Sequence, residues 1–368
     1  MDFGWWRGEA EKVPKESLCI IVPKVYAERA ITFAGKLAII DRALEVQSDA
    51  KHVYVPLTRE PSAEELAMLH GQVLDYTLKF HVFSEKRKQS KTLVEVLKGQ
   101  LPPALMASLP KALDVIGDIA IVEVPPELEK HRNLLGGAIL EVHKNVRIVL
   151  AKAGAVGGEY RLRDFEAIAG EHRTLTVHKE FGCAYQVDVT KAYFSPRLSN
   201  EHKRVSTSVQ AGETVVDLFA GVGPFSVLIA KNHEDAKVYA VDLNPDAVKL
   251  LRTNIRLNRV ENRVFPILGD ARRVVEERLK GVANRVIMNL PEKAIEFVPV
   301  ACKALKAEGG VLHFYSFVHE PDSLDALKAR FAEAVTDSGR WVQEFLLAKT
   351  VRETAPYECQ VVLDTKII

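Results

Sequence analysis

Clustered cysteines, long apolar runs and a surplus of charge are all missing from this 368-residue sequence. Metal cages and disulfide frameworks need thiols close together, whereas the four cysteines are scattered at Cys19, Cys183, Cys302 and Cys359. No run approaches the roughly 20 apolar residues of a membrane span, and the first residues lack the apolar core of a secretory signal. A formal net charge of +1 excludes a polybasic chain but not a local basic face. We therefore expect a cytoplasmic protein with no metal site and no membrane contact.

The composition that remains is that of a globular protein, with 47% hydrophobic and 27% charged residues. At roughly 100–200 residues per domain, the length predicts two or three domains. The pattern of the sequence changes character twice. We expect a small α+β domain over residues 1–80, a second α+β domain over 81–190 and a larger domain over 191–368.

Regular alternation of strands and helices begins at residue 213. Continuous apolar strands between amphipathic helices are typical of a parallel, doubly wound sheet. Two further strands, at 341–351 and 357–367, predict an antiparallel pair at one edge. The predicted fold class is therefore α/β, a Rossmann-like sheet at the C-terminus preceded by two smaller α+β domains. In the second of these domains, the segment RDFEAIAG (163–170) predicts a helix.

The stretch DLFAGVGPFS (217–226) places a Gly-x-Gly turn after an apolar strand. Ligands of such sheets bind beyond the carboxyl ends of the strands, and Asp217, Asp242 and Asp270 stand at three successive strand ends. Ser226 occupies the third glycine position of a dinucleotide fold, and Asp217 would repel a pyrophosphate. A cofactor with an amino group and no phosphate fits better, which indicates S-adenosylmethionine. Alternatively, the glycines only turn the chain and the acids cap helices.

The predicted contacts follow from the chemistry of S-adenosylmethionine. Gly221 and Gly223 let its methionyl part lie on the backbone, Asp242 accepts hydrogen bonds from both ribose hydroxyls, and Asp270 accepts one from the adenine amino group. The remaining cofactor contacts that we expect are Asp217, Phe219, Leu243, Ala271, Asn289 and Arg197.

The end of the fourth strand, Met288-Asn289-Leu290-Pro291-Glu292, is expected to face the methyl group. Enzymes that methylate exocyclic amines place an aromatic ring in this turn, and here there is none. Methylation of cytosine C5 needs a cysteine nucleophile nearby, which is also missing. Asn289 remains, and its amide can both donate to and accept from a base edge. The turn therefore favours methylation of a ring nitrogen.

Several motifs together carry a family resemblance: KAYFSPRLSNEHKRV (191–205), DLFAGVGPFS, AVDLNPDAV, ILGDAR and NRVIMNLPE, preceded by EYRLRDFEAIAGEHRTLTVHKEFG (159–182). With these the chain resembles the archaeal and eukaryotic tRNA guanine-37 N1-methyltransferases, well over 110–368 and more loosely over the first 80 residues. Those first residues are similar to the extra N-terminal domain of the archaeal members. The resemblance implies methyl transfer from S-adenosylmethionine, leaving S-adenosylhomocysteine, to N1 of the guanosine just 3′ of the tRNA anticodon.

The resemblance also implies residue roles. Glu201 matches the general base that removes the N1 proton, Arg161 matches the arginine that stabilises charge on guanine O6, and Asn289 matches the asparagine that orients the base. The other residues that we expect around the base and cofactor are Tyr193, Phe194, Pro291, Lys179 and Arg197.

Chemistry supports two of these roles. A guanidinium fixed at O6 stabilises charge where it develops, and we expect partial burial to raise the pKa of Glu201, which suits a base near neutral pH. The plainer alternatives are an ion pair of Arg161 with Glu159 or Asp164, and a Glu201 that merely favours the first turn of a helix.

The expected partner is tRNA, with no obligatory protein partner. The segment SEKRKQSK (84–91) is a basic patch, and Arg252, Arg256 and Arg259 share one helical face, although such a stripe is more often simply solvated. We expect the N-terminal domain to recognise tRNA shape away from the anticodon.

Three alternatives remain open. Relatives on the same scaffold act in wyosine synthesis, either methylating a tricyclic guanosine or transferring the aminocarboxypropyl group of the same cofactor. A non-enzymatic tRNA-binding protein is a second alternative, which the acids at all three strand ends disfavour. A dehydrogenase is the third, disfavoured by Ser226 and Asp217.

Overall fold

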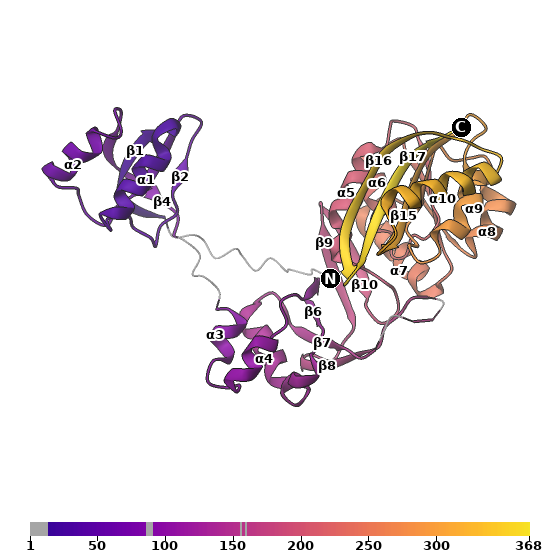
Figure 1. Cartoon of the computed structure of the whole chain (residues 1–368), viewed down its shortest axis with the longest axis horizontal. Coiled ribbons are helices and arrows are strands. Elements are labelled where there is room, and N and C mark those ends of the chain that lie inside the picture. Colours follow the sequence, from indigo (N-terminus) through magenta and orange to yellow (C-terminus); the bar gives the residue numbers. More distant parts are fainter. Residues whose placement is uncertain (1–13, 86–90, 155–156, 159) are drawn as a thin grey trace, which may run out of the picture. The chain divides into compact units, whose positions relative to one another are not determined.

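The computed structural model describes residues 14–85, 91–154, 157–158 and 160–368. The chain divides after Ser90 into two compact units, coloured along the sequence in Figure 1. Most of the basic patch predicted at 84–91 lies outside the described residues. Within the described ranges, no helix is long and apolar enough to cross a bilayer.

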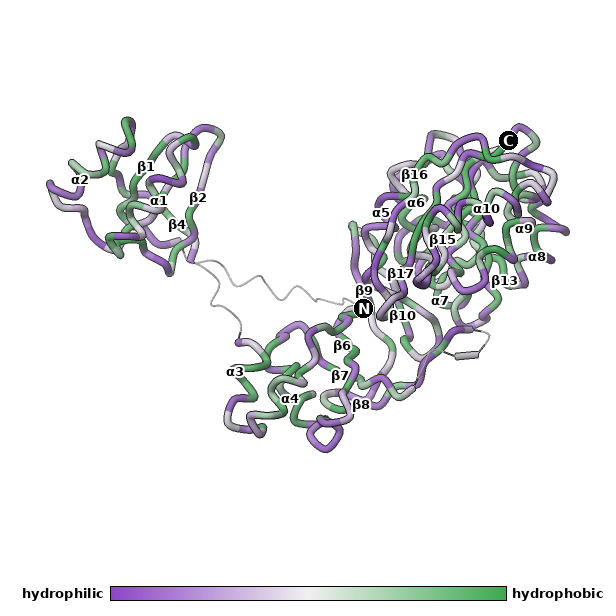
Figure 2. Tube along the Cα trace, viewed as in Figure 1, coloured by the Kyte–Doolittle hydropathy of each residue, from purple (hydrophilic) through white to green (hydrophobic). Residues whose placement is uncertain are grey.

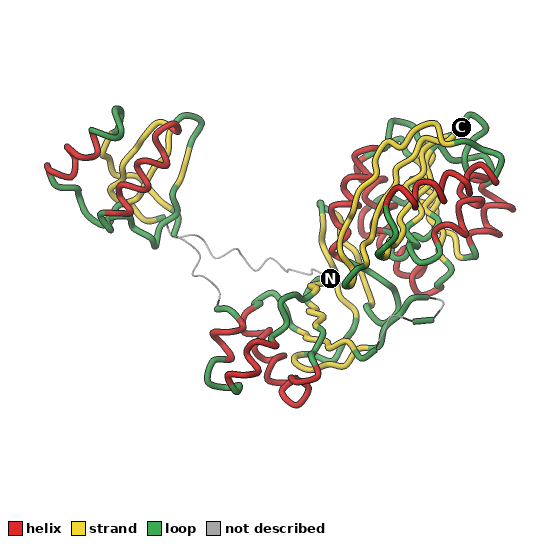
Figure 3. The backbone as a smooth tube through the Cα atoms, in the orientation of Figure 1, coloured by secondary structure: helices red, strands yellow, loops and turns green. Residues whose placement is uncertain are grey.

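The first unit is a four-stranded antiparallel sheet with two helices, as the α+β pattern predicted (Figure 3). Apolar residues of both helices pack with Ile20, Val22 and Val55 of the sheet. The strands, in sheet order, are β2 (Gln47–Ser48), β3 (His52–Pro56), β1 (Lys15–Pro23) and β4 (Thr77–Phe83), and the helices are α1 (Ala27–Lys36) and α2 (Ala63–His70).

The second unit begins with a smaller mixed sheet whose core is shared with two helices. Its strands follow chain order across the sheet. They are β5 (Asp114–Ile116), β6 (Ile119–Val122), β7 (Ile148–Lys152) and β8 (Phe165–Gly170), and the helices are α3 (Leu93–Leu97) and α4 (Arg132–Val142).

The helix predicted over 163–170 is wrong, because this segment forms β8, antiparallel to β7. Long-range pairing outweighs the local helical pattern here. Ile168 is buried in the core that α4 also lines. Gly170 ends the strand at φ +88°, where an added Cβ would lie 1.9 Å from the carbonyl oxygen of Arg147. Only glycine allows this close approach of the two chain segments.

A hairpin of β9 (Leu175–Glu180) and β10 (Cys183–Asp188) follows. Two asparagines of α7 (Pro245–Asn258) hold it by imitating a neighbouring strand. Asn254 accepts from the Gln186 amide (2.7 Å) and donates to its carbonyl (3.1 Å). Asn258 does the same for Ala184, at 2.9 and 2.7 Å. The hairpin is therefore fixed to a helix of the larger sheet.

That larger sheet has seven strands and confirms the Rossmann-like prediction. Its order is β13 (Val264–Leu268), β12 (Lys237–Asp242), β11 (Thr214–Asp217), β14 (Arg285–Met288), β15 (Gly310–His319), β17 (Glu358–Ile367) and β16 (Val342–Ala355). The first five are parallel, and β17 and β16 form the predicted antiparallel pair at one edge.

Helices cover both faces of the parallel part of this sheet, and its central strands β11 and β14 are almost wholly buried, whereas the edge strand β16 has no buried residue and carries several charged ones. Figure 2 colours these strands by hydropathy. Neighbouring Val215 and Val216 belong to different cores, one with α6 and α7 and the other with α9 and α10. Because the central strands are parallel, their carboxyl ends meet at one edge, where a ligand site is expected. The helices besides α7 are α5 (Ser199–Ser208), α6 (Pro224–Asn232), α8 (Ala271–Val274), α9 (Val298–Ala304) and α10 (Leu324–Asp337).

Candidate active site

A cavity of about 280 Å³ lies at the carboxyl ends of β11, β12 and β14. At its floor, Gly221 has φ +55°, and an added Cβ would meet only the Tyr193 carbonyl oxygen, at 3.7 Å. The turn therefore leaves its space to a ligand. The members of the predicted cofactor set that line this cavity are Phe219, Gly221, Asp242, Leu243, Asp270, Ala271 and Asn289.

Asp242 is held rigidly in the wall of this cavity. One carboxylate oxygen accepts from the Gly221 amide at 2.6 Å and the other from the Asn244 amide at 2.9 Å. Burial raises the pKa of Asp242, and these backbone donors act against the rise. Each carboxylate oxygen can accept more than one hydrogen bond, so Asp242 has the capacity to bind a pair of neighbouring hydroxyls.

Asp270 combines the predicted role with its plainer alternative. Its Oδ1 caps α8 by accepting from the amides of Arg272 (2.9 Å) and Arg273 (3.2 Å). The side chain also lines the cavity. Helix capping therefore uses only Oδ1 of Asp270. The other oxygen, Oδ2, lies 3.9 Å from the Arg272 guanidinium and can accept a hydrogen bond from a ligand.

Asp217 and Gly223 lie beneath the cavity and do not line it. The Ser226 hydroxyl donates to Asp217 Oδ2 at 2.7 Å, which explains a serine at the third glycine position. Asp217 Oδ1 has no hydrogen-bond partner among the described residues, and complete burial raises the pKa of this carboxyl to about 7. Gly223 begins α6 at φ +91°, where a Cβ would lie 2.4 Å from Leu251 Cδ1. Its glycine is required by packing.

These residues fit S-adenosylmethionine better than a dinucleotide. The unpaired oxygen of Asp217 below the floor and the carboxylate of Asp242 in the wall suit ammonium and hydroxyl donors. Apolar walls from Phe219 and Leu243 suit an adenosine. A pyrophosphate would meet the Asp242 carboxylate in the wall at close range.

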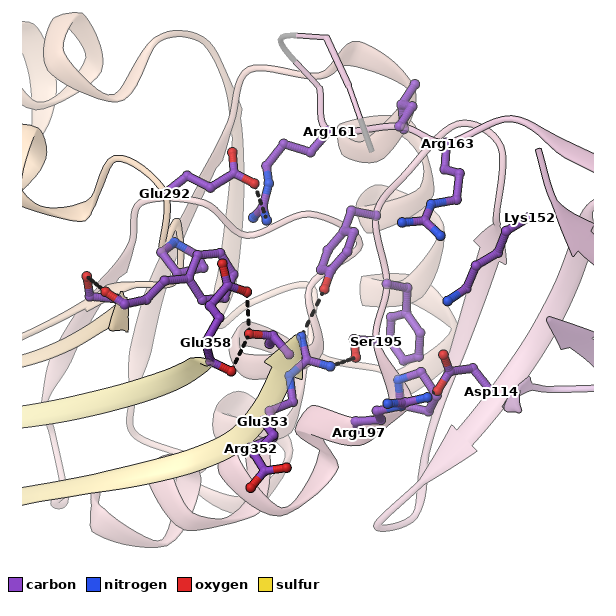
Figure 4. A pocket seen from close by; sticks show the side chains of 18 of the residues that line it. Asp114, Lys152, Arg161, Arg163, Ser195, Arg197, Glu292, Arg352, Glu353 and Glu358 are labelled. Atoms are coloured by element: carbon purple, nitrogen blue, oxygen red, sulfur yellow. Dashed lines mark hydrogen bonds and ion pairs between the residues drawn. The ribbon is translucent and has the colours of Figure 1, made fainter. Parts of the chain in front are cut away.

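A second cavity, of about 780 Å³, adjoins the first (Figure 4). Five residues of the predicted sites line this second cavity. Arg197 and Pro291 line it alone, whereas Arg161, Tyr193 and Phe194 line both cavities. Its cationic lining consists of Lys152, Arg161, Arg163, Arg197, Arg330 and Arg352. Five carboxylates share this lining, Asp114, Glu292, Asp322, Glu353 and Glu358, and three of them pair with Arg197, Arg161 and Arg330. Cations in such a lining are groups that can contact RNA phosphates.

Arg161 stands where the two cavities meet. It has φ +55°, and its guanidinium lies 5.1 Å from the centre of the Tyr193 ring. Its ion pair is with Glu292, at 3.1 Å, as Figure 4 shows. The alternative partner Glu159 lies outside the described residues. Arg161 Nε is buried and lacks a partner among the described groups, so this cation retains unused donor capacity at the junction.

Asn289 is reached from the second cavity by a short chain of hydrogen bonds. Arg352 donates to Gln360 Oε1 at 2.9 Å, and Gln360 Nε2 donates to Asn289 Oδ1 at 3.4 Å. Arginine can only donate, so it fixes which end of the Gln360 amide faces Asn289. Arg352 also donates to the Ser195 hydroxyl (3.2 Å) and the Tyr193 hydroxyl (3.4 Å).

Glu201 differs from expectation in its charge environment. Its Oε2 accepts from Arg204 Nε and the Tyr315 hydroxyl, both at 2.9 Å, and its Oε1 lies 2.7 Å from Lys349 Nζ. The expected rise in its pKa is wrong, because these donors outweigh burial and hold the pKa of Glu201 below its ordinary value. The residue is 3% exposed and is absent from the described lining of both cavities. Lys349, at 41% exposure, covers Oε1.

His202 is a cavity residue that sequence reasoning missed. Its Nδ1 lies 2.7 Å from Glu180 Oε1 of β9, and its ring meets Phe225 edge-on at 4.6 Å. Glu180 Oε2 is buried and lacks a hydrogen-bond partner among the described residues. No local spacing signals this pair, because its members come from a hairpin and a helix 22 residues apart.

Lys179 and the arginine stripe lie elsewhere. Lys179 lines a separate shallow hollow at the β9–β10 hairpin, so the structure does not bring it to either cavity. Arg252 and Arg256 lie on α7, and Arg259 caps its C-terminus in the left-handed region. The partners of Glu201 were missed for a similar reason: only Arg204 is local, at i+3, whereas Tyr315 and Lys349 come from β15 and β16.

Comparison with protein families gives three matches along the chain. Residues 176–340 match the TRM5/TYW2 methyltransferase domain, residues 93–174 the TYW2 N-terminal domain, and residues 19–65 the tRNA methyltransferase 5 N-terminal domain.

Among similar proteins are two archaeal tRNA (guanine(37)-N(1))-methyltransferases Trm5b. The protein from Pyrococcus abyssi is 44% identical over 73% of this chain and 78% of its own length. The protein from Methanocaldococcus jannaschii is 33% identical over 95% and 98%. A tRNA 4-demethylwyosine(37)-methyltransferase Taw21 from Saccharolobus solfataricus is 34% identical over 75% and 99%.

Solved structures agree with these relatives. P. abyssi Trm5b superposes with a TM-score of 0.70, 35% identity, 95% of this chain and 99% of that one. A complex of aTrm5 with tRNALeu superposes with a TM-score of 0.66 at 32% identity, over 95% of this chain and 99% of that one. M. jannaschii TYW2 in complex with AdoMet superposes with a TM-score of 0.54 at 29% identity, over 70% of this chain and 99% of that one.

Proposed function

Since this chain belongs to the TRM5/TYW2 methyltransferase family, we propose that it transfers the methyl group of S-adenosylmethionine to N1 of guanosine 37 of tRNA. The observation that carries the proposal is the pair of adjoining cavities. One places Asp242, Asp270 and apolar walls where an adenosine cofactor needs them, the other offers six lysine and arginine side chains beside five carboxylates, and the two share Arg161, Tyr193 and Phe194. A tRNA substrate and a cytoplasmic location are part of this proposal.

The cofactor, when bound, supplies an electrophilic methyl group. In the proposed site Asp242 accepts hydrogen bonds from the ribose hydroxyls, and Asp270 Oδ2 accepts one from the adenine amino group. Gly221 leaves room for the methionyl chain. Phe219, Leu243 and Ala271 exclude water around the adenosine. Asp217, whose pKa burial raises to about 7, attracts the amino group from below the floor when it is ionised, without contact through the lining.

The target base must leave its stack and enter the second cavity, as RNA-modifying enzymes require. Tyr193 is 39% exposed at the junction and offers a ring on which a guanine can stack. Asn289 orients the base edge, with its amide held by Gln360. Pro291 and Arg197 line the same cavity and bound the space that the nucleotide occupies.

Proton removal is assigned to Glu201 and charge stabilisation to Arg161. N1–H of guanine is a weak acid, and removal of its proton moves negative charge to O6, where a fixed guanidinium acts most strongly. Because Arg204 and Tyr315 occupy Oε2, the proton must go to Oε1. We therefore include in the proposal that the exposed Lys349 ammonium moves off Oε1 when the base arrives.

A wyosine-pathway activity is the second candidate, supported by the TYW2-type match over 93–174 and by the Taw21 relative. Two observations favour N1 methylation. The first unit matches the N-terminal domain of tRNA methyltransferase 5. The Trm5b relative from M. jannaschii aligns with this chain over 353 residues, and Taw21 aligns over 278. The difference is about the size of the first unit.

The test uses an unmodified tRNA transcript with guanosine 37 and labelled S-adenosylmethionine. We expect mass spectrometry to locate the methyl group on N1, and Glu201→Gln to lose at least about 100-fold in kcat. Calorimetric binding of S-adenosylmethionine by both proteins is the folding control. Methylation of a 4-demethylwyosine tRNA in place of the guanosine 37 transcript would replace N1 methylation by the second candidate.

A further inference from the structure

A row of buried charged groups extends behind Glu201. Arg204 lies one turn along α5 and contacts two carboxylates at once, Glu201 Oε2 and the side chain of Asp364 on β17. Asp364 is 8% exposed and also lies 2.7 Å from His313 Nδ1. The only positive charge between the two carboxylates in this described cluster is therefore the guanidinium of Arg204.

His313 fixes Asp364 from the other side. Arg285 NH1 lies 2.7 Å from His313 Nε2. Because arginine only donates, Nε2 is the acceptor, and Nδ1 carries the hydrogen that is donated to Asp364. Burial lowers the pKa of His313, so it stays neutral. Arg285 is itself anchored on Glu213 at 2.7 Å.

The contacts of Arg204 are not those of a simple ion pair. Its Nε and NH2 both approach Oε2 of Glu201, at 2.9 and 2.8 Å, and Oε1 is left to Lys349. Arginine commonly pairs with both oxygens of one carboxylate, and Arg204 makes that arrangement with Asp364. NH1 donates to Asp364 Oδ2 and NH2 donates to Asp364 Oδ1, so Arg204 cannot also pair with both oxygens of Glu201.

We propose that Asp364, acting through Arg204, is a positioning residue for Glu201: it holds the guanidinium on Oε2 and leaves Oε1 for the substrate. It also shares the positive charge of Arg204, so that less of that charge falls on Glu201 and the carboxylate remains basic. The inference rests on the proposed function of Glu201 as the base. The charged and titratable groups among the described residues that contact Glu201 are Arg204 of α5, Tyr315 of β15 and Lys349 of β16.

The first experiment is a double-mutant cycle with Asp364→Asn and Glu201→Gln, under saturating tRNA and S-adenosylmethionine. We expect Asp364→Asn to lower kcat about tenfold in the native background and to have little further effect beside Glu201→Gln. The calorimetric Kd of S-adenosylmethionine and the KM for tRNA should stay within about twofold. Glu344→Gln, a carboxylate-to-amide change at an exposed position of β16 outside this row, is the matched control, and its kcat should be unchanged.

The acid limb of the kcat profile gives an independent readout. Lys349→Met removes a cation from Glu201 and should move this limb to higher pH. Adding Asp364→Asn should move it back to lower pH, because Arg204 then pairs with Glu201 alone. A structural defect would lower the rate without this shift.

The contradicting results are distinct from those that test the proposed function. An equal loss from Asp364→Asn in both backgrounds, or a loss of cofactor binding with the loss of rate, would make Asp364 structural and overturn the inference. Full activity of Glu201→Gln would discard the base and the inference together. If Asp364→Asn does not fold, Arg204→Lys, which keeps the charge but cannot bridge two carboxylates, replaces it in the same cycle.

Discussion

The two cavities at the sheet edge are built in different ways. The first takes its polar groups from the ends of successive strands, with Gly221, Asp242 and Asp270 each one step along the Rossmann-like pattern. The second gathers residues from the small sheet, the loop before α5 and the edge strands β16 and β17. The first is therefore a property of the fold, and the second is a property of how distant segments meet.

Among the residues of the cofactor cavity, Asp242 should contribute most to cofactor binding, because two backbone amides fix its carboxylate in the wall. We expect Asp242→Ala to weaken S-adenosylmethionine binding about 100-fold, because the two ribose hydroxyls lose a charged acceptor. Isothermal calorimetry measures this, and tRNA binding in a gel-shift assay should not change. Asp246→Ala, on the exposed first turn of α7, is a matched control. Equal effects of the two substitutions would remove Asp242 from the proposed site.

This contrast also sets how much the sequence could predict. The strand-end acids and the glycine turn follow from local pattern, because parallel strands bring their ends together whatever the loops do. The edge pair β16–β17 was predicted, but its chemistry was not. Lys349 reaches Glu201 and Asp364 reaches Arg204 only because side chains of α5 contact β15, β16 and β17, and no spacing in the sequence encodes those contacts.

The pKa of Glu201 is the clearest case. Burial was predicted and is found, and it alone would raise the pKa. The two cations that reverse the direction are one local residue, Arg204, and one from a strand about 150 residues away. The failed helix at 163–170 has the same cause, since pairing with β7 decides its structure.

The second cavity depends on a cation at the junction, and this is the next effect in size. We expect Arg161→Met to lower kcat about 30-fold, because charge on guanine O6 loses its stabilisation. The Kd of S-adenosylmethionine should change little. Arg163→Met, in the same cavity but further from the junction, should act on the KM for tRNA instead. An Arg161→Met variant with changed KM and native kcat would make Arg161 a binding residue only.

The hydrogen-bonded chain to Asn289 should matter less than the cation. We expect Gln360→Leu to lower kcat about tenfold, because Asn289 then loses the group that fixes its amide. Gln360→Glu keeps the size of the side chain and can still accept from Arg352, but it cannot donate to Asn289. Single-turnover rates of the two variants separate these contributions. A native rate for both would show that the amide of Asn289 is fixed by other contacts.

The last prediction concerns folding stability instead of rate, and it tests Asp217 beneath the cofactor cavity. The folded-state pKa of Asp217 is about 7, above its ordinary value of 3.8, so the folded protein retains a proton that the unfolded chain loses. Stability from this group is complete below about pH 4 and declines as the pH rises to about 7. We expect Asp217→Asn to remove that decline, with a gain of up to about 4 kcal/mol above pH 7 and almost none near pH 4. Thermal unfolding of both proteins between pH 4 and 8 measures it. The difference in unfolding midpoint should grow with pH, because only the native protein loses stability as the pH rises. The Asp217→Asn variant keeps its local contact, since Ser226 can still donate to the amide oxygen. A difference that is constant with pH would mean that Asp217 is ionised in the folded protein, and that its unpaired oxygen is stabilised by groups beyond the described contacts.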